Sequence, residues 1–399
     1  MSKKTEHINF YLIGIGNQSV PLLDKDMLDL IAKSTIFSGG KRHYDLVKQI
    51  LPKQHQWIEI SGKMNVLVDA YKRVNSSVIV FASGDPFFYG FGNTLKRLLP
   101  DSTMKVFPYF NSIQRLCHKT QTNYNNLQVV SVHGRTWSDL DTALISGRDL
   151  IGVLTDQKKT PAKIAKRMLQ YGFNNYQIII GEELDGTYEK IESLALNTCT
   201  VKEHKPLNCV LLQKTKAINK HFGIPDNEFV PLLGRPKMIT KMPIRLSTIQ
   251  ALDLSNANVF WDIGACTGSV AIEAKRHYPG LSVIAFEKRE ECGAIIQQNK
   301  ERFSAPGIQI EIADFFNLDL ESFPIPDSIF IGGHGNRLAE MIVKINVLAP
   351  KAIIITNAVQ ESTSLTFITE LKKLDYKINS TIIQVNNHNK IVIHKAYQY

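Results

Sequence analysis

The chain has 399 residues, 44% of them hydrophobic and 21% charged, and a formal net charge of +10 at pH 7. This length predicts two or three domains with sizeable cores, and the composition excludes a disordered or fibrous protein. No apolar run reaches the roughly 20 residues of a membrane span, and the run at 8–15 lacks a signal-peptide cleavage site. The five cysteines form no C-x-x-C pair, which argues against a zinc site or a disulfide framework and favours the cytoplasm.

The positive charge is spread along the chain and forms no basic run. It suits an anionic partner, although a solvated basic surface would explain it equally well. No nucleic-acid recognition motif accompanies the charge, so nucleic acid is not favoured. A small polyanion would use the same charges.

The first half alternates strands and helices. Strands are predicted at residues 8–13, 78–82, 104–107, 129–132, 149–154, 177–180, 189–193 and 209–213. Helices are predicted at 26–33, 41–49, 91–99, 112–119 and 161–171. Ser112 is the predicted cap of the fourth helix, and Pro161 opens the fifth, which Gly172 ends. Polar residues without apolar periodicity follow, and they predict a linker at 216–222.

The second half repeats the alternation. Thr240 is a predicted N-cap, with Pro243 in the first turn of a helix to about residue 252. Strands are predicted at 259–261, 281–286, 308–312, 328–331, 352–356, 376–385 and 390–396, with helices at 269–277, 290–303, 337–347 and 364–374. The last two strands, joined by residues 386–389, suit an antiparallel hairpin at a sheet edge. The alternation predicts a parallel sheet with ligands at the carboxyl ends of its strands.

Residues 259–268 (VFWDIGACTG) form the most informative motif of this half. A buried strand, a glycine turn and a helix bring backbone N–H groups close to a nucleotide-like ligand, although a tight turn of any α/β protein has the same pattern. Glu287, after the next strand, could accept hydrogen bonds from both ribose hydroxyls, and Asp314 could hold an adenine amino group. The predicted cofactor rim comprises Asp262, Gly264, Gly268, Glu287, Asp314, Gly332 and Gly333. His334, between glycines on this rim, is a candidate for substrate contact, and Cys266 is expected to be a small side chain near the cofactor without a redox role.

Residues 83–92 (SGDPFFYGFG) combine a turn, three glycines and an aromatic cluster that is either core or a surface for a flat ligand. With GIG at 14–16, PYFNSIQ at 108–114, VHGR at 132–135, LTD at 154–156 and GE at 181–182, the stretch resembles the tetrapyrrole methylase family, and most closely its corrin-ring C5 methyltransferases. The segments GIPD at 223–226, 236–245, 262–268 and FIGG at 330–333 resemble the C15 methyltransferase and decarboxylase of the same pathway. The fusion, over nearly the whole chain, is similar to the bifunctional C5,15-methyltransferases of cobalamin synthesis.

The resemblance implies an α/β fold, with a tetrapyrrole methylase domain of two α/β subdomains at 1–215 and a Rossmann-like class I methyltransferase domain at 223–399. It implies one S-adenosylmethionine (SAM) site per domain, no catalytic metal or nucleophilic side chain, and a homo-oligomer. The reaction implied is methylation of precorrin-6Y, a polyanionic tetrapyrrole, at C5 and C15 with decarboxylation of the C12 acetate to give precorrin-8. Cofactor contacts are implied for Gly14, Gly16, Gly84, Asp85, Pro86, Phe87, Ser112, Thr155, Asp156, Gly181 and Thr240. Lys237, Lys241 and Arg245 are expected to bind substrate carboxylates or to order their segment over SAM.

The chain departs from the family pattern at two places. Asn17 and Gln18 follow the first glycine pair, where the family usually continues with Pro-Gly. Cys266 stands where the C15 enzymes usually have glycine. Three other functions remain open from the residues: a methyltransferase of RNA or another small molecule, an NAD-dependent dehydrogenase, and a non-catalytic scaffold. The spacing G-x-x-x-G of Gly264 and Gly268, in place of G-x-G-x-x-G, argues against the dehydrogenase.

Overall fold

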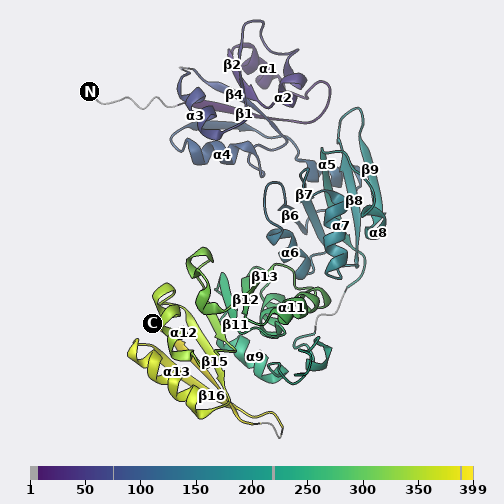
Figure 1. Cartoon of the computed structure of the whole chain (residues 1–399). Helices are drawn as coiled ribbons and strands as arrows, with labels where there is room; N and C mark the ends of the chain where they lie inside the picture. Colours follow the sequence, from purple (N-terminus) through teal and green to yellow (C-terminus); the bar gives the residue numbers. More distant parts are fainter. Residues whose placement is uncertain (1–7, 75, 218–220, 387–388, 399) are drawn as a thin grey trace, which may run out of the picture. The chain divides into compact units, whose positions relative to one another are not determined.

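The computed structural model describes residues 8–74, 76–217, 221–386 and 389–398 (Figure 1). The chain forms two compact units, one of residues 1–135, 149–165 and 176–215, the other of residues 136–148, 166–175 and 216–399. The basic start of the chain, the centre of the predicted linker and residues 387–388 of the predicted hairpin turn lie outside the described residues. Within the described ranges, no helix is long and apolar enough to span a membrane.

The first unit contains a parallel sheet of five strands in the order β3-β2-β4-β1-β5. Its strands are β1 (Asn9–Ile15), β2 (Ile36–Gly39), β3 (Gln56–Glu59), β4 (Val78–Ser83) and β5 (Thr103–Phe107). Its helices are α1 (Lys25–Ala32), α2 (Lys41–Val47), α3 (Met64–Lys72) and α4 (Phe91–Leu98). The sequence patterns did not predict β2, β3 or α3. Both strands have only four residues, too few for an alternating pattern to be recognised.

A second, mixed sheet has the order β6-β7-β10-β8-β9, in which β10 runs antiparallel to both of its neighbours. Its strands are β6 (Leu127–Ser131), β7 (Leu150–Leu154), β8 (Tyr176–Glu182), β9 (Lys190–Ala195) and β10 (Asn208–Lys214). The helices along this part of the chain are α5 (Ser112–Lys119), α6 (Ser138–Ile145), α7 (Pro161–Gln170) and α8 (Leu196–Cys199). The prediction of Ser112 as a cap was wrong by one residue. Asn111 caps α5, because its Oδ1 accepts from Gln114 N at 2.9 Å while Gln114 Oε1 accepts from Asn111 N at 3.1 Å.

The second unit is built on a sheet of seven strands in the order β13-β12-β11-β14-β15-β17-β16. The first five strands are parallel, and β17 is antiparallel to both β15 and β16, as predicted. The strands are β11 (Val259–Ile263), β12 (Ser282–Glu287), β13 (Ile308–Ile312), β14 (Ser328–Ile331), β15 (Ile353–Ala358), β16 (Lys377–Ile383) and β17 (Ile391–Tyr397). The helices are α9 (Met242–Ala251), α10 (Ser269–His277), α11 (Glu290–Arg302), α12 (Leu338–Leu348) and α13 (Glu361–Lys373). Strand order reverses between β11 and β14, where open α/β sheets bind their ligands.

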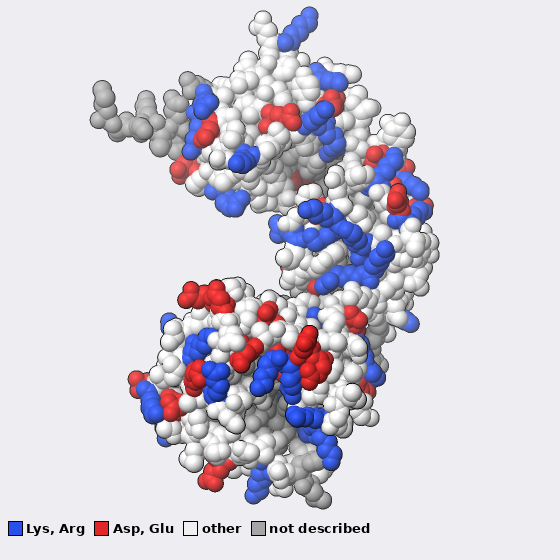
Figure 2. Space-filling model, in the orientation of Figure 1, with Lys and Arg blue, Asp and Glu red and all other residues white. Residues whose placement is uncertain are grey.

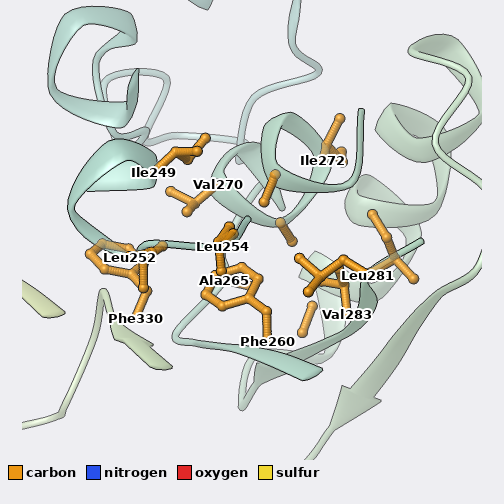
Figure 3. Packing of buried hydrophobic residues seen from close by; sticks show 14 of the residues in the cluster. Ile249, Leu252, Leu254, Phe260, Ala265, Val270, Ile272, Leu281, Val283 and Phe330 are labelled. Carbon is orange, nitrogen blue, oxygen red and sulfur yellow. The ribbon is translucent and has the colours of Figure 1, made fainter. Parts of the chain in front are cut away.

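Alternate residues of the central strands build two cores, one on each face of this sheet. Phe260 and Val283 pack with Val270 of α10 on one face (Figure 3). Trp261 and Ile284 pack on the other face with residues of α12 and α13. Burial on this scale stabilises by about 1.5–3 kcal/mol for each large side chain. The two cores fix the carboxyl ends of the strands, and with them the site below.

Basic side chains are partly scattered and partly clustered on the face of the molecule drawn in Figure 2. On the face drawn in Figure 2, Lys and Arg are mixed with Asp and Glu over the second unit and gather near β6. In the sequence, likewise, no run of basic residues accounts for the net charge of +10.

Candidate cofactor-binding pockets

A cavity of about 630 Å³ opens at the carboxyl edge of the seven-stranded sheet, where the strand order reverses. This C-terminal pocket is lined by residues from the segment before α9 and from the loops after β11, β12, β13 and β14. The predicted residues on its wall are Thr240, Asp262, Gly264, Glu287, Asp314, Gly332 and Gly333, with Lys237, Lys241 and His334. Gly268 and Arg245 do not line it.

Glycine is required at Gly264 for two reasons. Its φ is +78°, in the left-handed region, and a Cβ atom there would lie 2.5 Å from Gly333 N. The loops after β11 and β14 therefore approach each other backbone to backbone. Gly268 also has a positive φ, of +74°, but it lies at the start of α10, where a Cβ atom would meet Ile296 of α11 at 2.9 Å. Its role in the structure is to let α10 and α11 pack.

Cys266 stands at a turn position whose backbone conformation favours glycine. Its φ is +51°, so a non-glycine residue adopts the left-handed region inside the turn. The thiol donates to Met238 O at 3.3 Å and packs with Leu232 and Cys292. Burial raises the pKa of the Cys266 thiol, which keeps it protonated at neutral pH and agrees with the expected absence of redox chemistry.

Asp262 presents one carboxylate oxygen without a partner. The side chain is 1% exposed, and its Oδ2 accepts from Ala271 N at 3.0 Å. Its Oδ1 has no hydrogen-bond partner among the residues that the structure describes. Burial, with the charge of Glu287 nearby, raises the pKa of Asp262 to about 7. A ligand that brings a cation or a hydrogen-bond donor would satisfy this oxygen and favour ionisation.

Glu287 is also buried, but its carboxylate is already held. Its Oε2 accepts from Cys266 N at 2.9 Å and from Arg289 Nη2 at 2.8 Å, and its Oε1 accepts from Arg289 Nε at 2.9 Å. Burial alone would raise the pKa of Glu287, yet the hydrogen bonds from Arg289 and Cys266 lower it. The Glu287 carboxylate is therefore ionised. A ribose hydroxyl that donates a hydrogen bond to it would have to share its oxygens with Arg289.

Thr240, Asp314 and His334 contribute to the wall in different ways. Thr240 is not the N-cap of α9, because the cap position is Lys241 and no side chain caps the helix. Asp314 Oδ1 accepts from Phe316 N at 3.0 Å and caps the short helix η2 (Phe315–Asn317). His334 Nδ1 has no hydrogen-bond partner within the described part of the chain, and burial lowers the pKa of the ring. A neutral imidazole with an open nitrogen is therefore available to a ligand.

Arg245 lies in the core rather than on the pocket wall, a position that suits the second of its two predicted roles, ordering its segment, and not the contact with substrate. The side chain is 0% exposed. Its Nε donates to Glu273 Oε2 and its Nη1 to Asp226 Oδ1, both at 3.1 Å. Its Nη1 also donates to Thr240 O at 2.7 Å. Arg245 ties the segment before α9 to α10, which places Thr240, Lys237 and Lys241 beside the pocket.

The first unit has its own cavity, of about 480 Å³, lined by residues of both of its sheets. Of the residues predicted there, Gly16, Gly84, Ser112 and Gly181 line this N-terminal pocket. Gly84 has a φ of +61°, and a Cβ atom would lie 2.9 Å from Asn111 Cα. The other predicted residues, which do not line the pocket, are Gly14, Asp85, Pro86, Phe87, Thr155 and Asp156.

Several of these outer residues hold the turns around the pocket. Gly14 packs under Gly84, because a Cβ atom at Gly14 would lie 1.9 Å from Gly84 O. Asp85 Oδ1 accepts from Phe87 N at 2.8 Å, and Thr155 Oγ1 donates to Asn208 O at 2.8 Å. Asp156 accepts from three backbone N–H groups, the first of them that of Gly134, which lower its pKa to about 2.

Several polar residues of this wall were not named as site residues by the sequence patterns. They include Arg42, His43, Arg115, Asp185 and Asn208. Arg42 and His43 follow β2 directly. Because β2 was not predicted, its carboxyl end was not recognised as part of the rim. The adjacent apolar residues Ile36 and Phe37 are the signal that could have revealed β2 and, with it, this part of the rim.

Comparisons with known proteins separate the two halves of the chain. Residues 9–198 match the family described as tetrapyrrole (corrin/porphyrin) methylases, and residues 234–397 match the precorrin methyltransferase domain. A precorrin-6Y C(5,15)-methyltransferase [decarboxylating] of Sinorhizobium sp is 29% identical over 87% of this chain and 84% of its own length. A cobalt-precorrin-7 C(5)-methyltransferase of Salmonella typhimurium is 25% identical over 50% of this chain and 96% of its own length. A probable cobalt-precorrin-6B C(15)-methyltransferase (decarboxylating) of Thermoplasma volcanium is 32% identical over 40% of this chain and 79% of its own length.

The chain belongs to the precorrin-6Y C5,15-methyltransferase (decarboxylating) family. The resemblance predicted from the motifs, and the α/β fold class that it implied, are thereby confirmed. The family is one of SAM-dependent methyltransferases, so the dehydrogenase and the scaffold are set aside.

The C-terminal pocket fits the cofactor of this family in its donor and acceptor groups. The unpartnered Asp262 Oδ1 suits the ammonium or sulfonium of SAM, and the ionised Glu287 suits its ribose. Gly264 and Gly333 leave the backbone open to close approach. Ile244, Val270, Phe286 and Met341 supply apolar wall. These residues would hold the cofactor without a metal or a nucleophilic side chain.

Proposed function

We propose that the chain methylates precorrin-6Y at C5 and at C15 and removes the carboxyl group of the C12 acetate, giving precorrin-8. One SAM site would lie in each domain, with the domains at residues 1–215 and 223–399 and the linker at 216–222. One observation carries the proposal: each unit has its own pocket beside a glycine with positive φ, Gly84 in the first and Gly264 in the second. The C5 and C15 relatives match the respective halves.

The residues present suit a reaction that needs alignment more than chemical catalysis. SAM supplies the methyl group when bound, and C5 and C15 of the ring are enamine-like carbons that are already nucleophilic. Glycine loops and apolar walls hold donor and acceptor in line and exclude water, which favours loss of the sulfonium charge. The ring's own imine system can accept the electrons that decarboxylation releases. No side chain has to form a covalent bond.

The charges on the C-terminal pocket suit a polycarboxylated ring. Basic side chains on its wall outnumber acidic ones: they are Arg235, Lys237, Lys241, Lys288, Arg289 and Arg337, against Asp262, Glu287 and Asp314. Lys237 and Lys288 are exposed, and neither has an ion pair within the described residues. We propose that Lys237 and Lys241 contact substrate carboxylates, and that nucleic acid is not a partner.

The assembly and the compartment are also part of the proposal. The five cysteines are all free and buried, as suits a protein of the reducing cytoplasm. We propose a homo-oligomer, which light scattering of the purified chain would test.

The decisive experiment separates the two sites by one variant in each. Purified chain with SAM and precorrin-6Y should give a doubly methylated, decarboxylated product by mass spectrometry. Gly264→Ala should stop C15 methylation and release of carbon dioxide, whereas Gly84→Ala should stop C5 methylation. At least one variant should accumulate a singly methylated product. Loss of both methylations from both variants alike would contradict one site per domain, and no methyl transfer by the wild-type chain would reject the proposed substrate.

A further inference from the structure

A cluster of polar side chains on the wall of the N-terminal pocket has no role in the function argued so far. It consists of Asn17 after β1, Arg42 and His43 at the start of α2, and Ser83 at the end of β4. These elements meet at the carboxyl edge of the parallel sheet, since β2, β4 and β1 are neighbours in it. The cluster is therefore placed where ligands of such sheets bind.

Arg42 carries a charge that no carboxylate neutralises. Its Nη1 donates to Asn17 Oδ1 at 2.8 Å and its Nη2 to Ser83 Oγ at 2.5 Å, and both acceptors are neutral. No Asp or Glu oxygen of the described residues forms an ion pair with it, whereas Arg115 on the same pocket wall pairs with Asp185. Burial lowers the pKa of Arg42, which shows that the site disfavours an uncompensated cation. A guanidinium has five N–H donors, and only two are used here.

Ser83 has an unused donor because of the tautomer of His43. Gly40 N donates to His43 Nδ1 at 3.2 Å, so Nδ1 carries no proton. Burial and the charge of Arg42 lower the pKa of His43 to about 4, and the ring is neutral with its proton on Nε2. Nε2 then donates to Ser83 Oγ at 2.9 Å. Ser83 Oγ accepts from both His43 and Arg42, and its own proton has no acceptor among the described residues.

We infer that Arg42 and Ser83 form a carboxylate-binding subsite of the N-terminal pocket, with Asn17 and His43 as positioning residues. A guanidinium with free N–H groups beside a free hydroxyl donor matches the two oxygens of a carboxylate. The inference rests on the proposed function, which offers two sources of that group. One is the amino-acid end of the cofactor, and the other is an acetate or propionate of the tetrapyrrole.

The test compares probes that differ in the carboxylate. S-Adenosylhomocysteine has an amino-acid carboxylate, and 5′-methylthioadenosine lacks it; uroporphyrin is a polycarboxylated tetrapyrrole. Binding to the full chain is measured by calorimetry for the two nucleosides and by porphyrin fluorescence for the third. All variants are made in a background of Gly264→Ala, Lys237→Gln and Lys241→Gln, which is expected to weaken nucleoside and tetrapyrrole binding at the C-terminal pocket. The variants are Arg42→Gln and Ser83→Ala, with Ser83→Thr as the conservative replacement. Arg97→Gln, at an exposed arginine of α4 outside the pocket, is the matched control.

The two sources give different patterns. If the cofactor supplies the carboxylate, Arg42→Gln weakens S-adenosylhomocysteine about tenfold or more and leaves 5′-methylthioadenosine unchanged. If the tetrapyrrole supplies it, Arg42→Gln weakens only uroporphyrin, by a similar factor. In either case Ser83→Ala reproduces part of the loss, Ser83→Thr restores it and Arg97→Gln has no effect.

Three outcomes would overturn the subsite. The first is a change of less than twofold for all probes in Arg42→Gln, and the second is a parallel loss of both nucleosides, which indicates a structural defect. The third is failure of the wild-type chain to bind any probe, which would reject the proposed function together with the subsite. If the wild-type chain binds the probes and Arg42→Gln binds them equally well, the subsite is rejected and the proposed function is not.

Discussion

Replacing Arg245 by methionine should destabilise the second unit rather than weaken substrate binding. The change removes the charge between Glu273 and Asp226 and leaves Glu273, which is 0% exposed, without its guanidinium partner. Breaking a buried ion pair from one side costs about 3–5 kcal/mol. For a unit of this size, each kcal/mol corresponds to roughly 2–4 °C in melting temperature. We therefore expect the melting temperature of the second unit to fall by roughly 6–20 °C.

The assay is thermal and urea unfolding of the full chain, with hydrogen exchange of peptides from α9 and α10 to locate the loss. Glu273→Gln should also destabilise, and the double variant Arg245→Met with Glu273→Gln should lose less than the sum of the two. Arg302→Met, at an exposed residue of α11, serves as the control. By contrast, Lys237→Gln combined with Lys241→Gln should weaken tetrapyrrole binding at unchanged stability. A loss below about 1 kcal/mol in Arg245→Met, or a loss of substrate affinity alone, would refute the buried-pair reasoning.

Three further changes concern the C-terminal pocket. Gly264→Ala should weaken S-adenosylhomocysteine there more than tenfold, since its Cβ atom would meet Gly333 N at 2.5 Å, while Gly280→Ala, with no atom within 4 Å, should not. Cys266→Gly should change the stability by less than about 1 kcal/mol, because the relief of backbone strain at φ +51° offsets the larger conformational entropy of glycine in the unfolded chain. The β-branched variant Cys266→Val should destabilise by about 1–2 kcal/mol. Equal melting temperatures of the two variants would contradict this reasoning. Asp262 has a folded pKa of about 7, raised above its ordinary value, so it is neutral below that pH and ionises above it. Affinity for S-adenosylhomocysteine, whose ammonium group is cationic, should fall by up to about tenfold per pH unit below 7, and a calorimetric pH series should be flat in Asp262→Asn.

The second unit could be predicted from the sequence to within a few residues because its central strands β11, β12, β14 and β15 are buried on both faces. The run 259–263 is wholly or partly buried, so apolar character and glycine turns located the strands and their carboxyl ends. In the first unit, β3 has one fully buried residue, Ile58, among four, whereas all four residues of the equally short β14 are buried, so β3 lacks the apolar run that identified β14. A missed strand leaves the residues at its carboxyl end unrecognised as part of the rim, and Arg42 and His43 were missed in this way with β2.

Helix starts and charged residues show a second limit of sequence patterns. Asn111 and Ser112 are adjacent and both suit a cap; only the reciprocal bonds with Gln114 decide between them. Likewise, Lys237, Lys241 and Arg245 look alike in the sequence as basic residues before a cofactor turn. Their roles differ because Arg245 falls on the inner face of α9, opposite Glu273, and the sequence does not show that a helix 28 residues away presents a carboxylate there.

The partners of a guanidinium that is at least partly buried distinguish a structural from a ligand-binding charge in this chain. Arg245 meets two carboxylates, so its charge is compensated in the folded state and a ligand would have nothing to add. Arg42 meets an amide and a hydroxyl, which satisfy two N–H groups and leave the charge uncompensated. Desolvation of a cation is only partly offset by neutral acceptors, so the site gains most when an anion arrives. The same logic applies with opposite sign to Asp262, whose Oδ1 has no hydrogen-bond partner among the described residues. It predicts a cationic or hydrogen-bond-donating ligand group at Asp262 in the C-terminal pocket and an anionic group at Arg42 in the N-terminal pocket.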